Sequence, residues 1–290
     1  MRRLILSFLL LLIVAFPAFS ETSLWKVQSD TTILYIGGTC HILRKSDYPL
    51  PKEFDQAYED ADIIIFETDI KNMFDPGTQQ AMIRRGTYSD GTTLDQVLTT
   101  RAYDALKQYC KKIGVPISSF HQFKPAMVML TLLGLELERI GVYQNGVDFY
   151  FYQKAIIDEK RSEGLETIEE QIEIVTLIGE GNESDFVLYS IRDLKETRAA
   201  MEEIIVAWKT ADEEKLKELL IGELSKECPD LYEALFVARN RKWLFKIVEY
   251  LKTPQKELVL VGVGHLIGED GIIEQLRRRG YKVEKDISTD

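Results

Sequence analysis

The chain has 290 residues, of which 45% are hydrophobic and 29% are charged, and its formal net charge is −11 at pH 7. This length and hydrophobic content are typical of one large globular domain with a core of its own. The acidic balance repels nucleic acid and anionic membrane surfaces, so we expect neither of these as a partner.

Residues 1–20 predict a secretory signal peptide. A basic pair at 2–3 precedes an apolar run at 4–16, and the sequence Ala-Phe-Ser at 18–20 is typical of a cleavage site. The apolar run is short for a membrane span, so we expect no stable membrane anchor after cleavage. The sequence therefore predicts an exported protein, periplasmic or extracellular, in which residues 21–290 form a single domain.

The first part of the mature chain predicts a β–α–β unit. An apolar run at 32–36 reads as a buried strand and leads into a glycine-rich turn that ends in His41. Residues 52–60 fit a short amphipathic helix, and the apolar run at 61–66 reads as a second buried strand that ends in Glu67. A helix between two strands permits a parallel crossover, so we expect these strands to lie in one parallel sheet.

The middle of the chain, from about 76 to 253, predicts helices. The predicted helices are 92–113, 123–140, 147–160, 168–178, 185–210 and 230–251. Because no Ser/Gly-rich linker separates this block from the rest, we expect an inserted helical layer on the same domain. The remaining segments predict a strand at 257–263, a helix at 269–280 and a strand at 281–286. The fold class is therefore α/β, with a central β-sheet built from N- and C-terminal segments and a large inserted helical layer.

The chain contains three cysteines, Cys40, Cys110 and Cys228. An oxidising compartment would leave at least one of them unpaired, and a Cys110–Cys228 bridge is one pairing open to the chain, although sequence alone does not establish that these two residues meet. Cys40 lies beside His41, where a reactive thiol is one interpretation. We favour the other, a small buried residue.

Two of the three histidines occur in the same setting. Gly38 begins one Gly-x-x-His sequence that ends in His41, and Gly262 begins another that ends in His265. Each follows a predicted buried strand, and the carboxyl ends of strands are where open α/β sheets bind ligands. His121 lacks this context and is interpreted as structural.

His41, Glu67 and His265 are thus candidate catalytic residues at the ends of neighbouring strands. Two imidazoles and a carboxylate are a known ligand set for a catalytic divalent metal ion, with a position left for water. The metal would lower the pKa of that water and polarise a carbonyl or phosphoryl oxygen. Without a metal, the same three side chains could act as base, orienting acid and electrophile.

Three further residues are candidates for substrate binding. Glu166 precedes the capping box formed by Thr167 and Glu170, at the end of a short extended piece that could face the same cleft. Arg239 and Arg241 interrupt the amphipathic pattern of the helix at 230–251. A guanidinium in the cleft would bind a substrate carboxylate or an oxyanion, and the alternative is a solvated face.

The motifs taken together resemble the TraB/GumN family, the bacterial relatives of the TIKI proteases, over nearly the whole mature region. The matching sequences are GTCH at 38–41, PLP at 49–51, AD at 61–62 with Glu67 and Asp69, KP at 124–125, GVD at 146–148, LET at 165–167 with EQ at 170–171, RNRKW at 239–243, the segment 262–271 and GYKV at 280–283. Their order and spacing make the resemblance specific.

The resemblance implies a metal-dependent protease site at His41 and His265, with Glu67 as the acidic partner. The erythromycin esterase-like proteins, which are more distant, are similar in using a histidine base near a strand-end glutamate. We therefore expect an exported hydrolase, a metal-dependent peptidase, that acts on a peptide or another small molecule. The alternatives are a non-catalytic binding protein for a small peptide or anionic ligand, and a metal-independent esterase with His41 as base.

Overall fold

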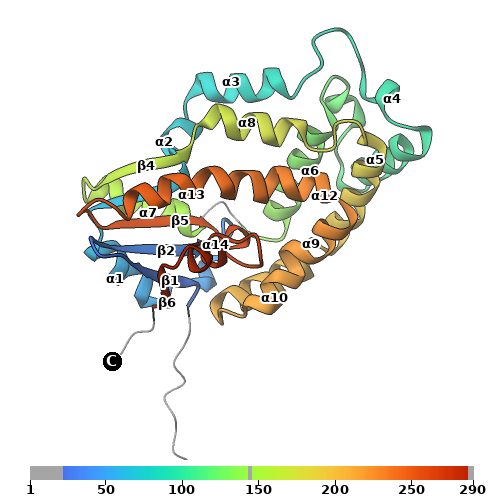
Figure 1. Ribbon diagram of the computed structural model, residues 1–290. Helices are drawn as coiled ribbons and strands as arrows, with labels where there is room; N and C mark the ends of the chain where they lie inside the picture. Colours follow the sequence, from blue (N-terminus) through green and yellow to red (C-terminus); the bar gives the residue numbers. More distant parts are fainter. Residues whose placement is uncertain (1–21, 143–145, 287–290) are drawn as a thin grey trace, which may run out of the picture.

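The structure is a computed structural model that describes residues 22–142 and 146–286 (Figure 1). The predicted signal peptide lies outside the described residues. A mixed sheet in the strand order β4-β3-β5-β2-β1-β6 forms the centre of the molecule. Its strands are β1 (Leu24–Gln28), β2 (Ile33–Thr39), β3 (Ile63–Thr68), β4 (Arg161–Glu166), β5 (Glu257–Gly262) and β6 (Lys282–Lys285).

Four neighbouring strands of this sheet run in the same direction. Strand β5 pairs in parallel with β2 on one side and with β3 on the other, and β3 pairs in parallel with β4. Strand β1 is antiparallel to both β2 and β6. The carboxyl ends of β4, β3, β5 and β2 therefore form a row along one edge of the sheet, which is where ligands bind in α/β proteins.

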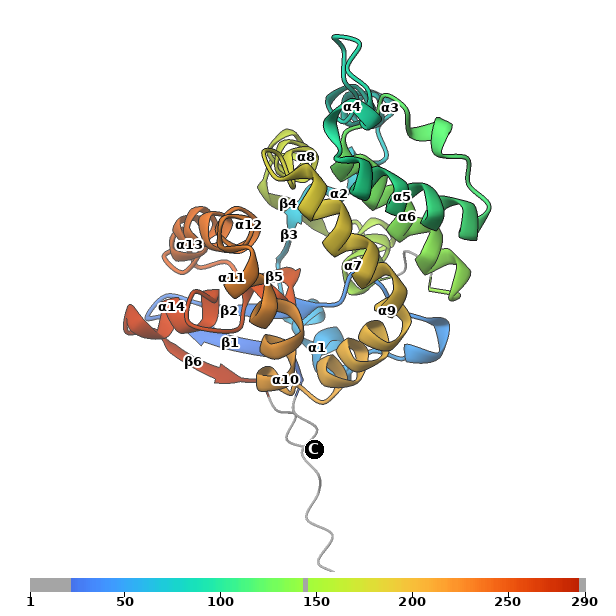
Figure 2. The ribbon, with the colours of Figure 1, turned by 90° about the vertical axis from the view of Figure 1, so that its right-hand side faces the viewer.

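Helices cover both faces of the sheet, which confirms the predicted α/β fold with a helical layer (Figure 2). Helices α1 (Lys52–Asp60), α7 (Val147–Ile157) and α9 (Glu183–Lys209) pack on one face, and α13 (Ala238–Tyr250) and α14 (Ile272–Arg278) pack on the other. The remaining α-helices are α2 (Ile70–Met73), α3 (Pro76–Arg85), α4 (Leu94–Val97), α5 (Thr100–Ile113), α6 (Pro125–Arg139), α8 (Ile168–Leu177), α10 (Glu213–Lys217), α11 (Glu223–Glu227) and α12 (Pro229–Tyr232).

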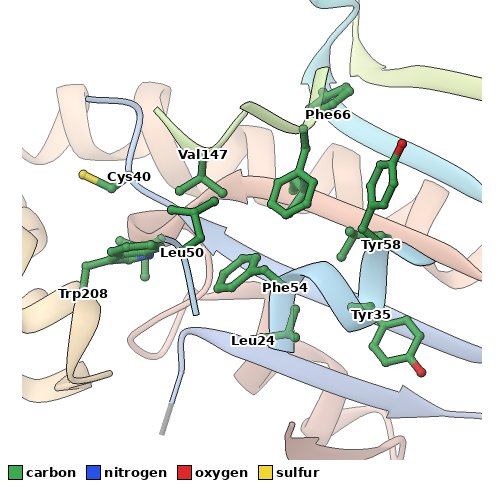
Figure 3. Close-up of a cluster of buried hydrophobic side chains, with 14 of the residues drawn as sticks. Leu24, Tyr35, Cys40, Leu50, Phe54, Tyr58, Phe66, Val147 and Trp208 are labelled. Atoms are coloured by element: carbon green, nitrogen blue, oxygen red, sulfur yellow. The ribbon is translucent and has the colours of Figure 1, made fainter. Parts of the chain in front are cut away.

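The core on the α1, α7 and α9 face is rich in aromatic side chains (Figure 3). The rings of Phe54 and Phe151 stack with their centroids 6.2 Å apart, and both side chains are fully buried. Trp208 joins helix α9 to this core, and its indole N–H donates a hydrogen bond of 2.6 Å to the carbonyl of Gly38. This bond ties α9 to the end of β2, immediately before the first Gly-x-x-His turn.

A second core fills the opposite face, where Trp243 and Ile247 of α13 pack against the alternate side chains of β2, β3 and β5. A third core lies away from the sheet, among α5, α6 and the first half of α9. The inserted helices therefore bury apolar surface of their own as well as covering the sheet.

The structure corrects several sequence-based boundaries. The inserted block is not purely helical, because β4 forms within it and adds the edge strand beside β3. The predicted helix 92–113 is two helices, since the chain leaves helical geometry at Leu98 and is capped again by Thr99. Helix α7 ends before Lys160, where Glu159 adopts a positive φ of 52°. Strand β1 is an element that the sequence pattern did not predict.

Two further predictions concern cysteines and the membrane. All three cysteines are free thiols, with Cys110 buried in the third core and Cys228 partly exposed, so the Cys110–Cys228 bridge is absent from the described residues. Cys40 is buried, as interpreted from the sequence. Within the described ranges, no helix has the length and apolar character that crossing a membrane requires.

Candidate functional site

The row of strand ends brings together Glu166 from β4, Glu67 from β3, His265 after β5 and His41 after β2. The order of these residues in space follows the order of the strands. Arg239, from the first turn of α13, enters the same group from the second face of the sheet. We call these five residues the strand-end cluster.

Glu67 is the centre of the strand-end cluster. Its Oε1 accepts a hydrogen bond of 2.8 Å from the backbone N–H of Gly262, and it lies 3.6 Å from Nε2 of His41 and 3.9 Å from Nε2 of His265. Its Oε2 accepts a hydrogen bond of 2.6 Å from Arg239. Burial favours the neutral acid, but the surrounding imidazoles, the Arg239 guanidinium and the backbone hydrogen bond from Gly262 outweigh it and lower the pKa of Glu67 to about 2.

Gly262 leaves room for the close approach of His41 and Glu67. A Cβ on this residue would lie 3.0 Å from Nε2 of His41 and 3.2 Å from Oε1 of Glu67. Its backbone angles, φ −49° and ψ 132°, suit any L-residue. A side chain at this position would therefore crowd His41 and Glu67, whereas the local backbone conformation does not require glycine.

His41 is the exposed histidine of the strand-end cluster, with 56% of its side chain accessible. Its Nδ1 lies 2.8 Å from a carboxylate oxygen of Asp148, in the first turn of α7. Gly146 lets this helix approach, since a Cβ there would lie 2.2 Å from the carbonyl carbon of His41. The negative charge of Asp148 outweighs desolvation and raises the pKa of His41 to about 9.

His265 is the buried histidine. Its ring lies between those of Phe236 and Trp243, with centroid distances of 4.9 Å and 4.4 Å. Burial disfavours the imidazolium and lowers the pKa of His265 to about 3, so this ring is neutral near pH 7.

Asn240 sets the tautomer of His265. The Nδ2 of Asn240 donates to the carbonyls of His265 and Asp270, which leaves its Oδ1 to accept the hydrogen bond of 2.7 Å from Nδ1 of His265. Because Nδ1 carries the proton, Nε2 of His265 presents its lone pair to the cluster. The two Gly-x-x-His histidines are thus electrostatically different, one exposed and cationic, the other buried and neutral.

Arg239 uses all of its donors within the protein. Its Nε and Nη2 make a two-point contact with Glu166, at 3.1 Å and 2.7 Å, and Nη2 also bonds Glu67. Its Nη1 donates to the carbonyl of Leu235 at 3.2 Å and lies 3.1 Å from Nε2 of His265. An arginine has five N–H groups, and the five contacts above give each of them a partner within the protein. A substrate carboxylate would therefore have to replace one of these partners.

Glu166 faces inward to the cluster. Its carboxylate holds Arg239 and also accepts a hydrogen bond of 3.2 Å from the indole N–H of Trp243. Burial raises the pKa of Glu166, whereas the guanidinium opposes that rise. Glu166 thus anchors the arginine, whose Nη2 also bonds Glu67.

Arg241 and His121 lie away from the cluster. Arg241 is exposed and its Nη1 lies 3.4 Å from Glu233, so the structure does not bring this candidate to the site. His121 is exposed in the helical layer, with its Nδ1 4.0 Å from a carboxylate oxygen of Asp95.

Sequence reasoning missed Asp148 and Asn240 as members of the site. Asp148 follows the Gly146-Val147 pair that begins α7, and Asn240 stands between Arg239 and Arg241. A polar residue in the first turn of a helix that begins with glycine was the available signal for Asp148. For Asn240, the signal was a small amide within an otherwise basic pair.

The donor chemistry of the site fits a divalent cation. Two ligands of one Zn²⁺ ion can lie up to roughly 4.2 Å apart, twice the usual metal–ligand distance, and Glu67 Oε1 lies 3.6 Å from His41 Nε2 and 3.9 Å from His265 Nε2. Both Nδ1 atoms are held by oxygen atoms, as outer-shell partners hold metal-binding histidines.

The arrangement is not a preformed metal site. Among the residues that the structure describes, no three His, Cys, Asp or Glu side chains converge on a common metal position. The lone pair of His265 Nε2 faces Arg239 Nη1 instead. The guanidinium of Arg239 therefore occupies the position at which a metal ion would meet Nε2 of His265.

The chain matches one known protein family over most of its length. The sequence model of the TraB/PrgY/gumN family matches residues 23–285. The chain belongs to the TraB/PrgY/gumN family. The match covers the sheet, its covering helices and the whole strand-end cluster, so the family assignment applies to the domain that carries the site.

Relatives with assigned names are distant from this TraB/PrgY/gumN member. Metalloprotease TIKI1 of Danio rerio is 22% identical over 90% of this chain and 62% of its own length, and Metalloprotease TIKI1 of Homo sapiens is 22% identical over 92% and 63%. Metalloprotease TIKI2 of Xenopus tropicalis is 21% identical over 90% and 59%. The chain thus spans less than two thirds of the length of each of these relatives. No solved structure matches it significantly.

Proposed function

We propose that this TraB/PrgY/gumN protein is an exported hydrolase, a metal-dependent peptidase, whose reaction takes place at His41, Glu67 and His265. The observation that carries the proposal is that Nε2 of His41 and Nε2 of His265 both lie within 4 Å of one oxygen of Glu67. Such a set of two imidazoles and one carboxylate is suited to binding a catalytic divalent ion. The names of the TIKI relatives support the same chemistry for this chain.

A bound divalent ion would polarise the substrate carbonyl and lower the pKa of an attacking water. The residues of the chain have separable roles around it. Glu67, ionised because of its low pKa, supplies the central negative charge. His265 supplies a neutral imidazole whose tautomer is set by Asn240.

His41 is the member of the cluster that a substrate can reach, because more than half of its side chain is exposed. Asp148 holds its Nδ1–H and keeps Nε2 directed toward Glu67. Without a metal, His41 could act as a base toward water only after losing its own proton, because Asp148 raises its pKa to about 9. Arg239 and Glu166 act on the reaction through Glu67, by fixing the orientation of its carboxylate.

The proposal is tested by metal content and peptide hydrolysis measured on the same preparations. We expect wild type to bind a divalent metal, to cleave a mixed peptide library and to lose activity on chelation. His41→Ala and His265→Ala should reduce kcat/KM by at least about 100-fold and weaken metal binding, while both proteins remain folded. Arg241→Ala is the matched control, since Arg241 lies outside the cluster. If both histidine variants fold, bind metal and cleave peptides as wild type does, the proposal is wrong.

A second candidate is hydrolysis without a metal, with His41 as base. It is favoured by the contact between His41 and Asp148, which is complete without a cation and lies at an exposed ring. Full activity after exhaustive chelation, with loss of activity in His41→Ala, would support this candidate over the first.

A further inference from the structure

We propose that the guanidinium of Arg239 and the divalent cation are alternative partners of His265 Nε2, and that Arg239 withdraws onto Glu166 when the cation binds. This inference rests on the proposed metal-dependent function. It assigns Arg239 a second role, as an internal occupant of the metal position.

The contacts of Arg239 divide into a fixed part and an exchangeable part. On the fixed side, Glu166 receives two parallel hydrogen bonds and the carbonyl of Leu235 receives a third. Glu166 is itself held by the indole of Trp243, whose ring lies 4.5 Å from the guanidinium carbon. A two-point carboxylate contact and an aromatic face are strong attachments for an arginine side chain.

On the exchangeable side, Arg239 makes one hydrogen bond to Glu67 and one contact with His265. His265 can use its lone pair once only, because Nδ1 already carries the proton that Asn240 accepts. Nε2 therefore cannot receive an N–H from Arg239 and ligate a cation at the same time. For His265 to bind any divalent ion in this tautomer, Arg239 must therefore release Nε2.

The charges of the site support such an exchange. Without a cation, Arg239 compensates the buried carboxylates of Glu67 and Glu166, which would otherwise repel each other. A divalent ion at Glu67 would supply positive charge on that side, and Glu166 would retain the guanidinium. Arg239 thus stabilises the site in the absence of a cation, and Glu166 holds the guanidinium when a cation is bound.

The inference is tested by following the ring nitrogens of the wild-type protein by NMR during a titration with Zn²⁺ alone. The chain has three histidines, and His121 lies outside the cluster, so it serves as an internal reference. We expect the Nε2 signals of both His41 and His265 to move to metal-bound positions, with the Arg239 Nη1–H signal losing its bond to His265. The signal of His121 should remain unchanged.

The outcomes separate this inference from the proposed function. If neither His41 nor His265 responds to Zn²⁺, the proposed metal site itself is wrong. If His41 responds while His265 and Arg239 keep their mutual contact, the metal site stands and the exchange is wrong.

A binding measurement supplies a second test. Arg239→Gln removes the competing donor, so we expect its affinity for Zn²⁺ to be roughly ten-fold higher than that of wild type. Arg241→Gln removes an equal charge from the same helix and should leave the affinity unchanged. Equal affinities for wild type and a folded Arg239→Gln protein would overturn the exchange, and the NMR titration covers the case in which that variant does not fold.

Discussion

Nδ1 of His41 lies 2.8 Å from the carboxylate of Asp148, a residue that is far away in sequence but adjacent in the fold. The equivalent atom of His265 meets a neutral amide oxygen from Asn240. This difference in partner, together with the difference in burial, makes one histidine cationic and the other neutral although both end the same Gly-x-x-His sequence. The chemistry of the cluster follows from this asymmetry.

Replacing Asp148 should change the titration of His41. In Asp148→Asn the negative charge that raises the pKa of His41 is gone, so the pKa should fall from about 9 toward the ordinary 6.5. NMR titration of the metal-free protein measures this directly. Asp158→Asn, which removes a carboxylate from the other end of α7, should leave the pKa of His41 unchanged.

The same pair should contribute to stability in a defined pH window. The folded pKa of His41 is above its ordinary value, so its stabilisation is complete below about 6.5 and is lost as the pH rises through about 9. Asp148→Asn should therefore lower the free energy of unfolding more at pH 6 than at pH 10. An equal cost at both pH values, measured by denaturant unfolding, would argue against the ion pair.

Asn240 should be needed for the stability of the fold around His265 and for the hydrogen bond at its Nδ1. Asn240→Leu preserves much of the volume but leaves buried polar groups unpaired, so we expect the free energy of unfolding to fall by about 1–3 kcal/mol. The Nδ1–H signal of His265 should shift in NMR spectra because it loses its acceptor, while Nε2 still accepts from Arg239. Asn72→Leu, at an exposed position in α2, is the control for the substitution itself. An unchanged Nδ1–H signal in Asn240→Leu would contradict the assigned role.

Gly262→Ala should separate activity from stability. The added Cβ would force His41 and Glu67 to shift by a few tenths of an ångström, so we expect kcat/KM to fall by several-fold, less than the roughly 100-fold loss that a misplacement of about 1 Å can cause. Its backbone conformation is open to alanine, so the free energy of unfolding should change by no more than about 1 kcal/mol. Gly134→Ala, where nothing lies near the added carbon, is the matched control. Full activity in Gly262→Ala would show that the site tolerates the intrusion.

Metal affinity should rise with pH. His41 must lose its proton to become a ligand, so below its pKa of about 9 each unit of pH should strengthen Zn²⁺ binding by about ten-fold. Calorimetric titrations at several pH values would measure the slope. In Asp148→Asn the slope should flatten at a lower pH, because the proton leaves His41 more readily.

The fold class, and the placement of His41, Glu67 and His265 at strand ends, could be predicted from local sequence patterns alone. The runs before Gly38 and Gly262 form buried strands because they are apolar and partly β-branched; β5 ends at Gly262, whereas β2 continues through Gly38 to Thr39. Both histidines and Glu67 could therefore be assigned to strand ends. Strand β4 has few apolar residues and pairs only at the sheet edge, so the sequence pattern did not separate it from the inserted helices.

The roles within the cluster could not be read from sequence for a physical reason. After Thr39 the chain continues without regular structure to His41, whereas after Gly262 it enters the 3₁₀ turn Val263–His265. Identical spacings thus direct the two rings to different surroundings. The order of the strands, which places β5 between β3 and β2, depends on long-range pairing that no local motif encodes.

Binding of a divalent metal ion by His41, Glu67 and His265 is tested most directly by anomalous diffraction from crystals of the protein loaded with Zn²⁺. We expect one strong anomalous peak in contact with Nε2 of His41, Oε1 of Glu67 and Nε2 of His265, with the guanidinium of Arg239 turned to Glu166. A Zn²⁺-treated crystal that shows no peak at these atoms, with Arg239 still bonded to His265, would contradict the proposed site.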